Sequence, residues 1–376
     1  MLRTLDEKGG IGVYTENLVR TLIRQATDHS FVLFYPGAQH VGRFGTQPNI
    51  RERVVPICNK ALWDQIAMPW ACWRESVDLL LHPKFTVPLL GSQRSVMVLH
   101  GADWFLPEAA QFYTLADRAY IRVFMPLYLR KASAVLSVSK ITTDHFDRIF
   151  RLPEGKVRTV YFGPAPHFRR VTDVPELEAV KRRYCLPDRF VLTLSKQAGG
   201  ERKNMAGILR AYEQLQGSVD QDLVVGGMGC ERFREDYAIP ADNWGARVHF
   251  PGWIEQRDLP AVYTLADLFL YPSNQEAFPI PVTEAMSCGT PIVTSSANGL
   301  AEIAGDAALL VDPSDAAAIA GAALRIIRDE ELKARLSQAG LERARTFSWE
   351  ACGRRTLAIL EEVAALNGGV ADAQAA

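Results

Sequence analysis

The sequence predicts an α/β protein built from two Rossmann-like domains. A length of 376 residues exceeds what one hydrophobic core usually organises, so two domains of ordinary size are expected. Short apolar runs alternate with helix-length segments in both halves, which is typical of parallel sheets. A link rich in Pro and Gly at 162–168 separates the two series. Because ligands of open α/β sheets bind outside the carboxyl ends of the strands, we expect both domains to present loops to a central cleft.

The first domain is expected over residues 1–168 and begins with a glycine-rich turn. Gly9, Gly10 and Gly12 lead into a helix over 15–24, whose apolar residues recur at helical spacing. A helix start of this kind can approach a phosphate or an acceptor, although three glycines alone are also an ordinary flexible turn. The predicted buried strands of this domain are 31–35, 77–81, 95–99 and 134–138.

The second domain is expected over residues 169–348 and repeats this architecture. A further amphipathic helix is predicted at 349–366, and the small and polar residues 367–376 are expected to form a frayed tail. A helix is predicted over 203–215, and the predicted strands are 190–194, 223–225, 248–250, 268–271, 291–294 and 308–311.

Charge and cysteine usage narrow the class of protein. The chain has 42 basic and 43 acidic residues, and this balance argues against a general nucleic-acid binder. Its six cysteines are scattered without a C-x-x-C pair, which fits a reducing cytoplasm. No apolar run approaches the roughly 18–20 residues that span a bilayer, so any membrane contact is expected to be peripheral.

A local excess of basic residues lies between Arg118 and Arg158, with nine basic and three acidic residues. Its first part, 118–131, interleaves aromatic and aliphatic residues and could rest on an anionic membrane or meet an acceptor phosphate. The alternative is a helix packed on the core with a solvated basic side. We favour this alternative, because Pro126 is expected to break a long interfacial helix.

Three tryptophans, Trp63, Trp70 and Trp73, follow each other at close to helical spacing. They could form a carbohydrate-binding platform or one packed face of a helix. We favour packing.

Two carboxylates flank a predicted helix start in the segment 273–291. Pro281 suits the first helical turn, so Glu276 is expected in the preceding loop and Glu284 near that turn. Unsatisfied amides at such a terminus attract a diphosphate, and the arrangement suits a nucleotide-sugar. Alternatively, the two acids merely offset the helix dipole.

Two cations, Arg202 and Lys203, precede the helix predicted after strand 190–194. Cations at a helix N-terminus oppose its dipole, so a bound anion is the better explanation for them. His100 ends the strand 95–99, where its side chain is expected to point into the cleft, although a lone histidine is more often structural. Asp220 and Asp222 form an acid-x-acid pair that we interpret as a polar turn without a metal.

Taken together, these motifs resemble the retaining glycosyltransferases of group 1, called glycosyltransferase family 4, whose donor motif is a Glu, seven residues and a second Glu. The resemblance runs from Gly9 to Glu350. It implies the GT-B fold, with helix 349–366 crossing back onto the first domain. It also implies transfer of a hexose, with mannose favoured, from a nucleotide-sugar to a hydroxyl of a glycan or lipid-linked acceptor. Retention of configuration, a role in surface polysaccharide synthesis and independence of metal are implied as well.

The resemblance assigns roles to the candidate residues of the second domain. Lys203 neutralises the leaving diphosphate with help from Arg202, and Glu276 holds sugar hydroxyls. Glu284 accepts from the ribose hydroxyls. The backbone amides around Phe278 and Ile280 are implied to hold the sugar.

In the first domain, the resemblance implies that His100 contacts the donor sugar near its reacting carbon. It also places Gly10, Ile11 and Gly12 in the nucleotide-sugar site. Catalytic roles are therefore expected for His100, Lys203 and Glu276.

Two features depart from the family pattern. Ala277 and Pro279 stand where the family usually has glycine, which removes one amide and some backbone freedom. Only residues 1–5 precede the glycine-rich turn, where the family has a complete strand. A non-catalytic GT-B partner subunit and a nucleotide-sugar epimerase of the same fold therefore stand as alternatives.

Overall fold

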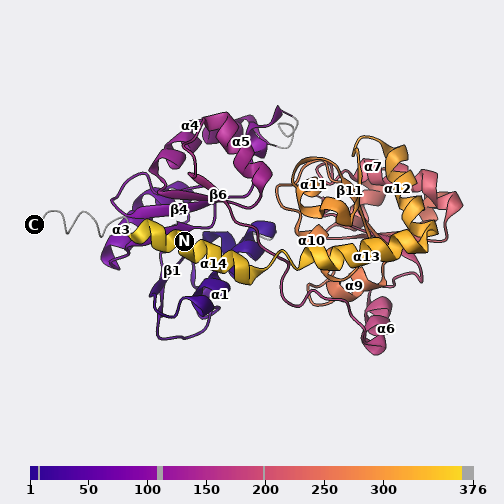
Figure 1. Ribbon diagram of the computed structural model, residues 1–376, viewed down its shortest axis with the longest axis horizontal. Coiled ribbons are helices and arrows are strands. Elements are labelled where there is room, and N and C mark those ends of the chain that lie inside the picture. The colour runs from indigo at the N-terminus through magenta and orange to yellow at the C-terminus, as the bar shows by residue number, and fades with distance from the viewer. Residues whose placement is uncertain (7–8, 108–112, 198–199, 366–376) are drawn as a thin grey trace, which may run out of the picture. The chain divides into compact units, whose positions relative to one another are not determined.

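The computed structural model describes residues 1–6, 9–107, 113–197 and 200–365 (Figure 1). The chain forms two compact units, one of Met1–Phe162 with the segment that starts at Ser348, the other of Gly163–Phe347. The division falls earlier than the boundary expected after residue 168, because Phe168 is buried in the core of the second unit. The tail expected at 367–376 lies outside the described residues.

The first unit contains two parallel sheets. One pairs β1 with β2, and the other has the order β3-β4-β5-β6. The four predicted strands are confirmed, with ends shifted by up to two residues. Strands β2 and β6 were not predicted, because β2 is rich in charge and β6 is very short. The bounds are β1 Phe31–Tyr35, β2 Ile50–Val54, β3 Leu79–His82, β4 Arg94–Leu99, β5 Ala134–Ser137 and β6 Val157–Thr159.

Helices cover these sheets, and the last helix of the chain belongs to this unit. It packs against the first helix, α1 (Figure 1). Arg24 donates to Glu350 at 2.8 Å, and the Gln25 amide donates to the Glu350 carbonyl at 3.0 Å. The bounds are α1 Gly10–Gln25, α2 Lys60–Leu62, η3 Trp63–Ala67, α3 Met68–Arg74, α4 Leu115–Lys131, α5 Lys140–Phe150 and α14 Trp349–Ala365.

Two expectations for the first unit were wrong. Pro126 does not break its helix, because α4 continues through it while Met125 and Leu129 anchor the helix in the core. The tryptophans do not form one packed face either. Trp63 is fully buried, whereas Trp70 and Trp73 are 53% and 72% exposed.

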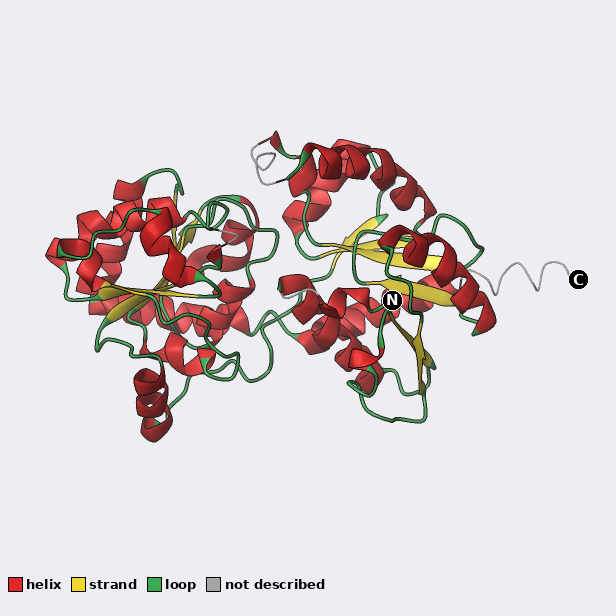
Figure 2. Ribbon diagram, turned by 180° about the vertical axis from the view of Figure 1, so that it is seen from behind, coloured by secondary structure: helices red, strands yellow, loops and turns green. Residues whose placement is uncertain are grey.

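The second unit has a single six-stranded parallel sheet in the order β12-β11-β10-β7-β8-β9 (Figure 2). Two apolar clusters pack on it, as expected for a sheet covered by helices on both faces. The predicted strands are all present, with small shifts of their ends: β7 Phe190–Leu194, β8 Asp222–Gly226, β9 Val248–His249, β10 Leu268–Tyr271, β11 Ile292–Ser295 and β12 Leu309–Val311. The longer helices are α6 Val174–Arg183, α7 Met205–Leu215, α9 Leu259–Leu265, α10 Ile280–Ser287, α11 Asn298–Ala304, α12 Ala316–Arg328 and α13 Glu330–Ala344.

The strand order places a topological switch point between β7 and β10. From β7 the chain adds strands towards β9 on one side, and from β10 it adds strands towards β12 on the other. Crevices at such points, outside the carboxyl ends of the strands, are where open α/β sheets bind ligands. The loops that follow β7 and β10 are therefore where a site is expected.

Candidate functional site

A buried cluster of charged and polar side chains joins the loops after β7 and β10. Lys203 follows β7, and its Nζ contacts both the Glu276 carboxylate and the Tyr271 hydroxyl. Tyr271 is the last residue of β10, and its hydroxyl also donates to Glu276 Oε1 at 3.3 Å. Ser273 Oγ donates to the same oxygen at 3.2 Å. The sheet topology thus brings Lys203 and Glu276 together at the switch point.

Two further cations face this cluster. Arg202 lies 3.5 Å from Glu276 Oε2, and the exposed Lys196 is near enough to disfavour the charged form of Lys203. The site therefore has three positive groups and one carboxylate. This excess of positive charge suits a polyanionic ligand such as a diphosphate.

The cluster shifts the protonation of its members. Burial opposes the charged form of Glu276, but Lys203 and Arg202 outweigh it and hold the pKa of the carboxyl below its usual value. Burial also lowers the pKa of Lys203, although Glu276 counteracts this effect. The carboxylate is therefore ionised at neutral pH and forms an ion pair with Lys203 in the free protein.

Asn204 fixes the backbone of this loop. Its φ of 61° is left-handed, a conformation that asparagine tolerates better than most residues. Its side chain caps α7 by accepting from the Gly207 amide at 3.2 Å, and it donates to the carbonyls of Pro272 and Pro313. The helix therefore begins at Met205, later than predicted, and Lys203 lies in the preceding turn.

The loop after β10 is bound to neighbouring backbone. The Asn274 amide donates to the Arg202 carbonyl at 2.9 Å, and the Gly299 amide donates to the Glu276 carbonyl at 2.9 Å. A Cβ on Gly299 would lie 2.1 Å from the Ala277 carbonyl oxygen, so only glycine fits there. These contacts hold Glu276 in position next to Lys203.

The start of α10 does not offer the amides that the sequence suggested. The Ile280 amide donates to the Phe278 carbonyl at 3.1 Å, and the Val282 and Thr283 amides donate to the Pro279 carbonyl. Pro281 has no N–H group. Since the first turn satisfies its own donors, the Ile280 amide is not available to a sugar. The Phe278 ring is buried and packs edge-on against Phe347.

Glu284 lies in the second turn of α10 and is separate from the lysine cluster. Its Oε2 accepts from the buried Tyr263 hydroxyl at 3.1 Å. Burial raises its pKa to about 7, and the hydrogen bond from Tyr263 opposes this rise. The other carboxylate oxygen has no hydrogen-bond partner among the described residues, so it can accept from a ligand hydroxyl.

In the first unit, His100 follows β4 and packs edge-on against the buried Tyr14, with ring centroids 4.8 Å apart. Its Nε2 lies 2.9 Å from the Pro83 carbonyl oxygen. A carbonyl can only accept, so Nε2 carries the proton. The ring is partly exposed at the carboxyl end of the sheet, as expected for a ligand contact.

The candidate glycines of the first unit lie within α1. The helix begins at Gly10, earlier than predicted, so Gly10, Ile11 and Gly12 form its first turn. The Val13 amide already bonds the Gly9 carbonyl, whereas the three preceding amides have no partner inside the helix. This turn is suited to an anion, unlike the start of α10.

The acid-x-acid pair has structural roles. Asp222 begins β8 and pairs with Arg247 at 2.9 Å and His249 at 2.7 Å, and Asp220 is exposed. Among the residues that the structure describes, no three His, Cys, Asp or Glu side chains gather as a metal site would require.

Three hydroxyls of the site were missed at the level of sequence, namely those of Tyr263, Tyr271 and Ser273. The only available signal was position, because Tyr271 and Ser273 follow a predicted strand towards its carboxyl end. Tyr263 gave no signal, since it reaches Glu284 from a different helix, α9.

Comparison with known proteins agrees with this architecture. A crystal structure of a glycosyltransferase from Rickettsia africae superposes with a TM-score of 0.74 and 16% identity, over 94% of this chain and 95% of that chain. The structure of Anabaena Alr3699/HepE in complex with UDP and glucose gives a TM-score of 0.73 and 17% identity, over 94% and 96% of the two chains. The fold is that of the GT-B glycosyltransferases.

The sequence comparisons define the family. Residues 8–164 match the model of Glycosyltransferase Family 4, and residues 179–343 match that of Glycosyl transferases group 1. The chain belongs to the group 1 glycosyltransferases, glycosyltransferase family 4, and it is a glycosyltransferase.

Two relatives come from Escherichia coli. The O-antigen chain mannosyltransferase B is 29% identical over 77% of this chain and 75% of its own length. The serotype-specific mannosyltransferase WbdA is 25% identical over 70% of this chain, but over only 31% of its own length.

Proposed function

We propose that this protein transfers a mannose-type hexose from a nucleoside diphosphate sugar to a hydroxyl of a glycan or lipid-linked acceptor, with retention of configuration, in the synthesis of a surface polysaccharide. The observation that carries the proposal is the cluster of Lys203, Arg202 and Glu276 at the switch point of the second sheet. Three cations around one buried carboxylate match a ligand that combines a diphosphate with a sugar.

The comparisons support the finer parts of this proposal. The two Escherichia coli relatives are named as mannosyltransferases, one of them for the O-antigen chain. The Anabaena structure is described with UDP and glucose. A nucleotide-sugar donor and a polysaccharide acceptor are therefore the first substrates to test.

Each residue of the second unit has its own role in the proposed reaction. The bond from the anomeric carbon to the diphosphate breaks, a bond to the acceptor oxygen forms on the same face, and the acceptor proton passes to a diphosphate oxygen. Lys203 and Arg202 stabilise the charge that develops on the departing diphosphate. Glu276 accepts from sugar hydroxyls, and Glu284 accepts from the ribose.

The first unit contributes the remaining contacts in this proposal. His100 contacts the sugar near the reacting carbon, and the first-turn amides of α1 receive anionic oxygens. No metal is assigned, because the cations beside Glu276 supply the charge stabilisation that a metal would otherwise provide.

We also propose that the protein works at the cytoplasmic face of a membrane, where a lipid-linked acceptor would lie. In the described residues no helix is both long and apolar enough to cross a bilayer. The first unit instead exposes large apolar side chains along 60–74, with Leu62, Ile66, Trp70 and Trp73 at helical spacing. Exposed tryptophans near basic residues are typical of contact with an anionic membrane surface.

Purified protein incubated with GDP-mannose, UDP-glucose and UDP-N-acetylglucosamine tests the proposal. A transferase should slowly release the nucleoside diphosphate and free sugar from its donor, and faster when acceptor glycans are added. Nuclear magnetic resonance of the product should show the anomeric configuration of the donor. A new sugar isomer would identify an epimerase, and no turnover of any donor would identify a non-catalytic subunit.

A further inference from the structure

Tyr14 lies in the second turn of α1 and contacts three other rings of the first unit. Its ring packs edge-on against His100, with centroids 4.8 Å apart and the ring planes at 86°. It meets Phe162 at 5.1 Å and Trp349 at 5.6 Å. Phe162 and Trp349 also contact each other, with centroids 5.0 Å apart. Four segments that are far apart in sequence therefore meet at the Tyr14 ring.

These contacts fix the position of Tyr14. The residue is 1% exposed, and Phe162 and Trp349 are 2% exposed each. Close packing confines buried side chains to single rotamers, and edge-on ring pairs add a directional preference. Tyr14 is therefore a rigid support for the imidazole of His100.

The hydroxyl of Tyr14 does not account for the role of the residue. It is buried without a hydrogen-bond partner among the described residues. Burial raises the pKa of this hydroxyl well above its usual value, so the group stays protonated. A buried hydroxyl that makes no hydrogen bond does not stabilise the fold. The ring is therefore the part of the side chain that matters.

His100 is held on another side by the backbone. Its Nε2 lies 2.9 Å from the Pro83 carbonyl oxygen, which fixes this nitrogen as the protonated one. A hydrogen bond through one nitrogen still permits the imidazole to turn about that bond, whereas the contact with Tyr14 defines the plane of the ring. Together the two contacts set the tautomer and the orientation of the imidazole.

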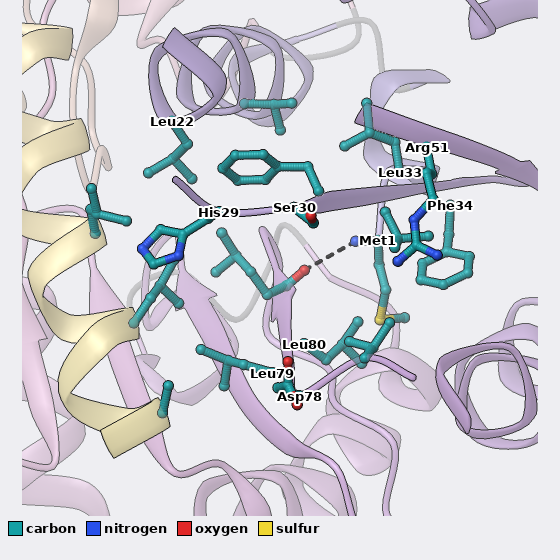
Figure 3. Close-up of a pocket in the computed structure, with 18 of the residues that line it drawn as sticks. Met1, Leu22, His29, Ser30, Leu33, Phe34, Arg51, Asp78, Leu79 and Leu80 are labelled. Atoms are coloured by element: carbon teal, nitrogen blue, oxygen red, sulfur yellow. Dashed lines mark hydrogen bonds between the residues drawn. The ribbon is translucent and has the colours of Figure 1, made fainter. Parts of the chain in front are cut away.

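The same face of α1 is packed less closely further along the helix. Leu18 and Leu22 follow Tyr14 at intervals of four residues, which places all three side chains on one face. Both leucines line a cavity of about 490 Å³ that β1 and β3 also line (Figure 3). Close packing on this face of α1 is thus found at the residue that contacts His100, and a variant at Leu22 offers a matched control.

We propose that Tyr14 is a positioning residue for the transfer reaction, and that its ring holds His100 in the orientation in which the imidazole contacts the donor sugar. This inference rests on the proposed function, in which His100 lies near the reacting carbon. Misplacement of a reacting group by about 1 Å can cost on the order of 100-fold in rate. Loss of the Tyr14 ring should therefore lower kcat, whereas KM should change little, because the cluster of Lys203, Arg202 and Glu276 still binds the diphosphate.

Nuclear magnetic resonance of isotope-labelled histidine tests the positioning without any substrate. His100→Asn identifies the resonances of His100. In wild type and Tyr14→Phe, these resonances should show the proton on Nε2 and shifts caused by the neighbouring ring. In Tyr14→Leu the ring-induced shifts should be lost, and unchanged His100 resonances would overturn the proposal. Tyr35→Leu is the control, since Tyr35 packs against His40 with centroids 6.4 Å apart and should affect that histidine alone.

Initial rates with the donor that wild type turns over test the consequence for transfer. Tyr14→Phe should match wild type, and Tyr14→Leu should lower kcat by about 100-fold. Leu22→Ala removes buried contacts from the same helix face and should leave kcat unchanged. Tyr14→Met, whose flexible side chain fills the space without a ring, replaces Tyr14→Leu if that variant does not fold. An equal loss of kcat in Leu22→Ala would show that loosening of α1 alone is sufficient and would overturn the proposal.

A double variant shows whether Tyr14 acts through His100. Tyr14→Leu combined with His100→Asn should be no slower than His100→Asn alone, because the group that Tyr14 positions is already absent. Losses that add up would overturn the proposal, as would a His100→Asn protein as fast as wild type.

The two kinds of measurement separate this inference from the proposed function. If wild type turns over a donor and Tyr14→Leu keeps its kcat, only this inference fails. If wild type turns over no donor, the proposed function fails and the catalytic role of Tyr14 fails with it, while the His100 resonances still show whether Tyr14 orients the imidazole.

Discussion

Lys203 and Glu276 form a partly buried ion pair between loops, and the two residues lie 73 positions apart in sequence. The Tyr271 hydroxyl contacts both of them, and Arg202 approaches the second carboxylate oxygen. In the free protein the Glu276 carboxylate is therefore paired with the lysine that is proposed to bind the diphosphate. Donor binding must compete with Glu276 for Lys203 or share the lysine with it.

Glu276→Gln should separate donor binding from turnover. The amide keeps the shape of the side chain but leaves Lys203 and Arg202 without a countercharge. A nucleoside diphosphate should then bind as tightly as to wild type or more tightly, while transfer falls by about 100-fold or more, because the sugar hydroxyls lose an ionised acceptor. Calorimetry and initial rates measure the two effects.

Asp267→Asn is the matched control for this variant, since Asp267 pairs with Lys333 at 2.7 Å in the same unit. It should leave both binding and transfer unchanged. A Glu276→Gln protein that no longer binds the diphosphate would contradict the proposed competition.

Glu284 should make the stability of the second unit depend on pH. Its pKa is about 7 in the folded protein and near 4.5 when unfolded, so the folded state binds the proton more tightly. The contribution of Glu284 to the free energy of unfolding is therefore fully present below pH 4.5. It is lost as the pH rises through 7, and the total loss is about 3 kcal/mol. Glu284→Gln removes this loss, so it should raise the free energy of unfolding at pH 8 but not at pH 5. Urea unfolding of both proteins at pH 5 and pH 8 measures the free energy of unfolding. An equal effect of the substitution at the two pH values would show that Glu284 does not cause the pH dependence.

Gly299→Ala should impair catalysis without touching any charged group. The new Cβ would meet the Ala277 carbonyl oxygen at 2.1 Å and displace the loop that holds Glu276. A shift of about 1 Å can cost on the order of 100-fold in rate, and we expect a loss of this size in kcat/KM. Gly321→Ala in α12 is the control, since a Cβ there meets nothing within 4 Å and should stabilise the helix by up to about 1 kcal/mol. Unchanged kcat/KM in Gly299→Ala would show that the loop tolerates displacement.

Replacement of Trp70 and Trp73 by Ser should weaken binding to anionic vesicles. Burial of one large apolar side chain is worth about 1.5–3 kcal/mol, so the double variant should bind at least about tenfold more weakly. Trp253, which is 51% exposed in the second unit, provides the control variant Trp253→Ser. Vesicle flotation compares the double variant with Trp253→Ser, and equal binding of the two would show that Trp70 and Trp73 do not contact the membrane.

The sequence predicted the fold well where strands are buried on both faces. β1, β7 and β10 have the predicted bounds, because continuous apolar runs between turn residues define them. β2, with the sequence Ile-Arg-Glu-Arg-Val, was missed because three of its five residues are charged. Pro126 was misinterpreted because the packing of α4 on the core, which a local pattern does not contain, offsets the lost hydrogen bond.

The candidate site was predictable as a set of residues but not as a geometry. Lys203 was identified from its place after a strand and Glu276 from its place before a helix start, yet their pairing depends on the strand order β10-β7. At the start of α10, by contrast, the sequence led to a wrong prediction about the backbone amides. A helix start at Pro281 suggested open amides, whereas the Ile280 amide donates to the Phe278 carbonyl and the next amides donate to the Pro279 carbonyl.

Calorimetric titration of guanosine and uridine diphosphates measures whether the cluster of Lys203, Arg202 and Glu276 binds the diphosphate of the donor. Wild type should bind at least one of them, and Lys203→Ala should bind it about 100-fold more weakly, a loss of about 3 kcal/mol. Lys333→Ala, which breaks another lysine–carboxylate pair of the same unit, should bind like wild type. If Lys203→Ala binds the diphosphate as tightly as wild type, or if wild type binds neither, the cluster is not the donor site.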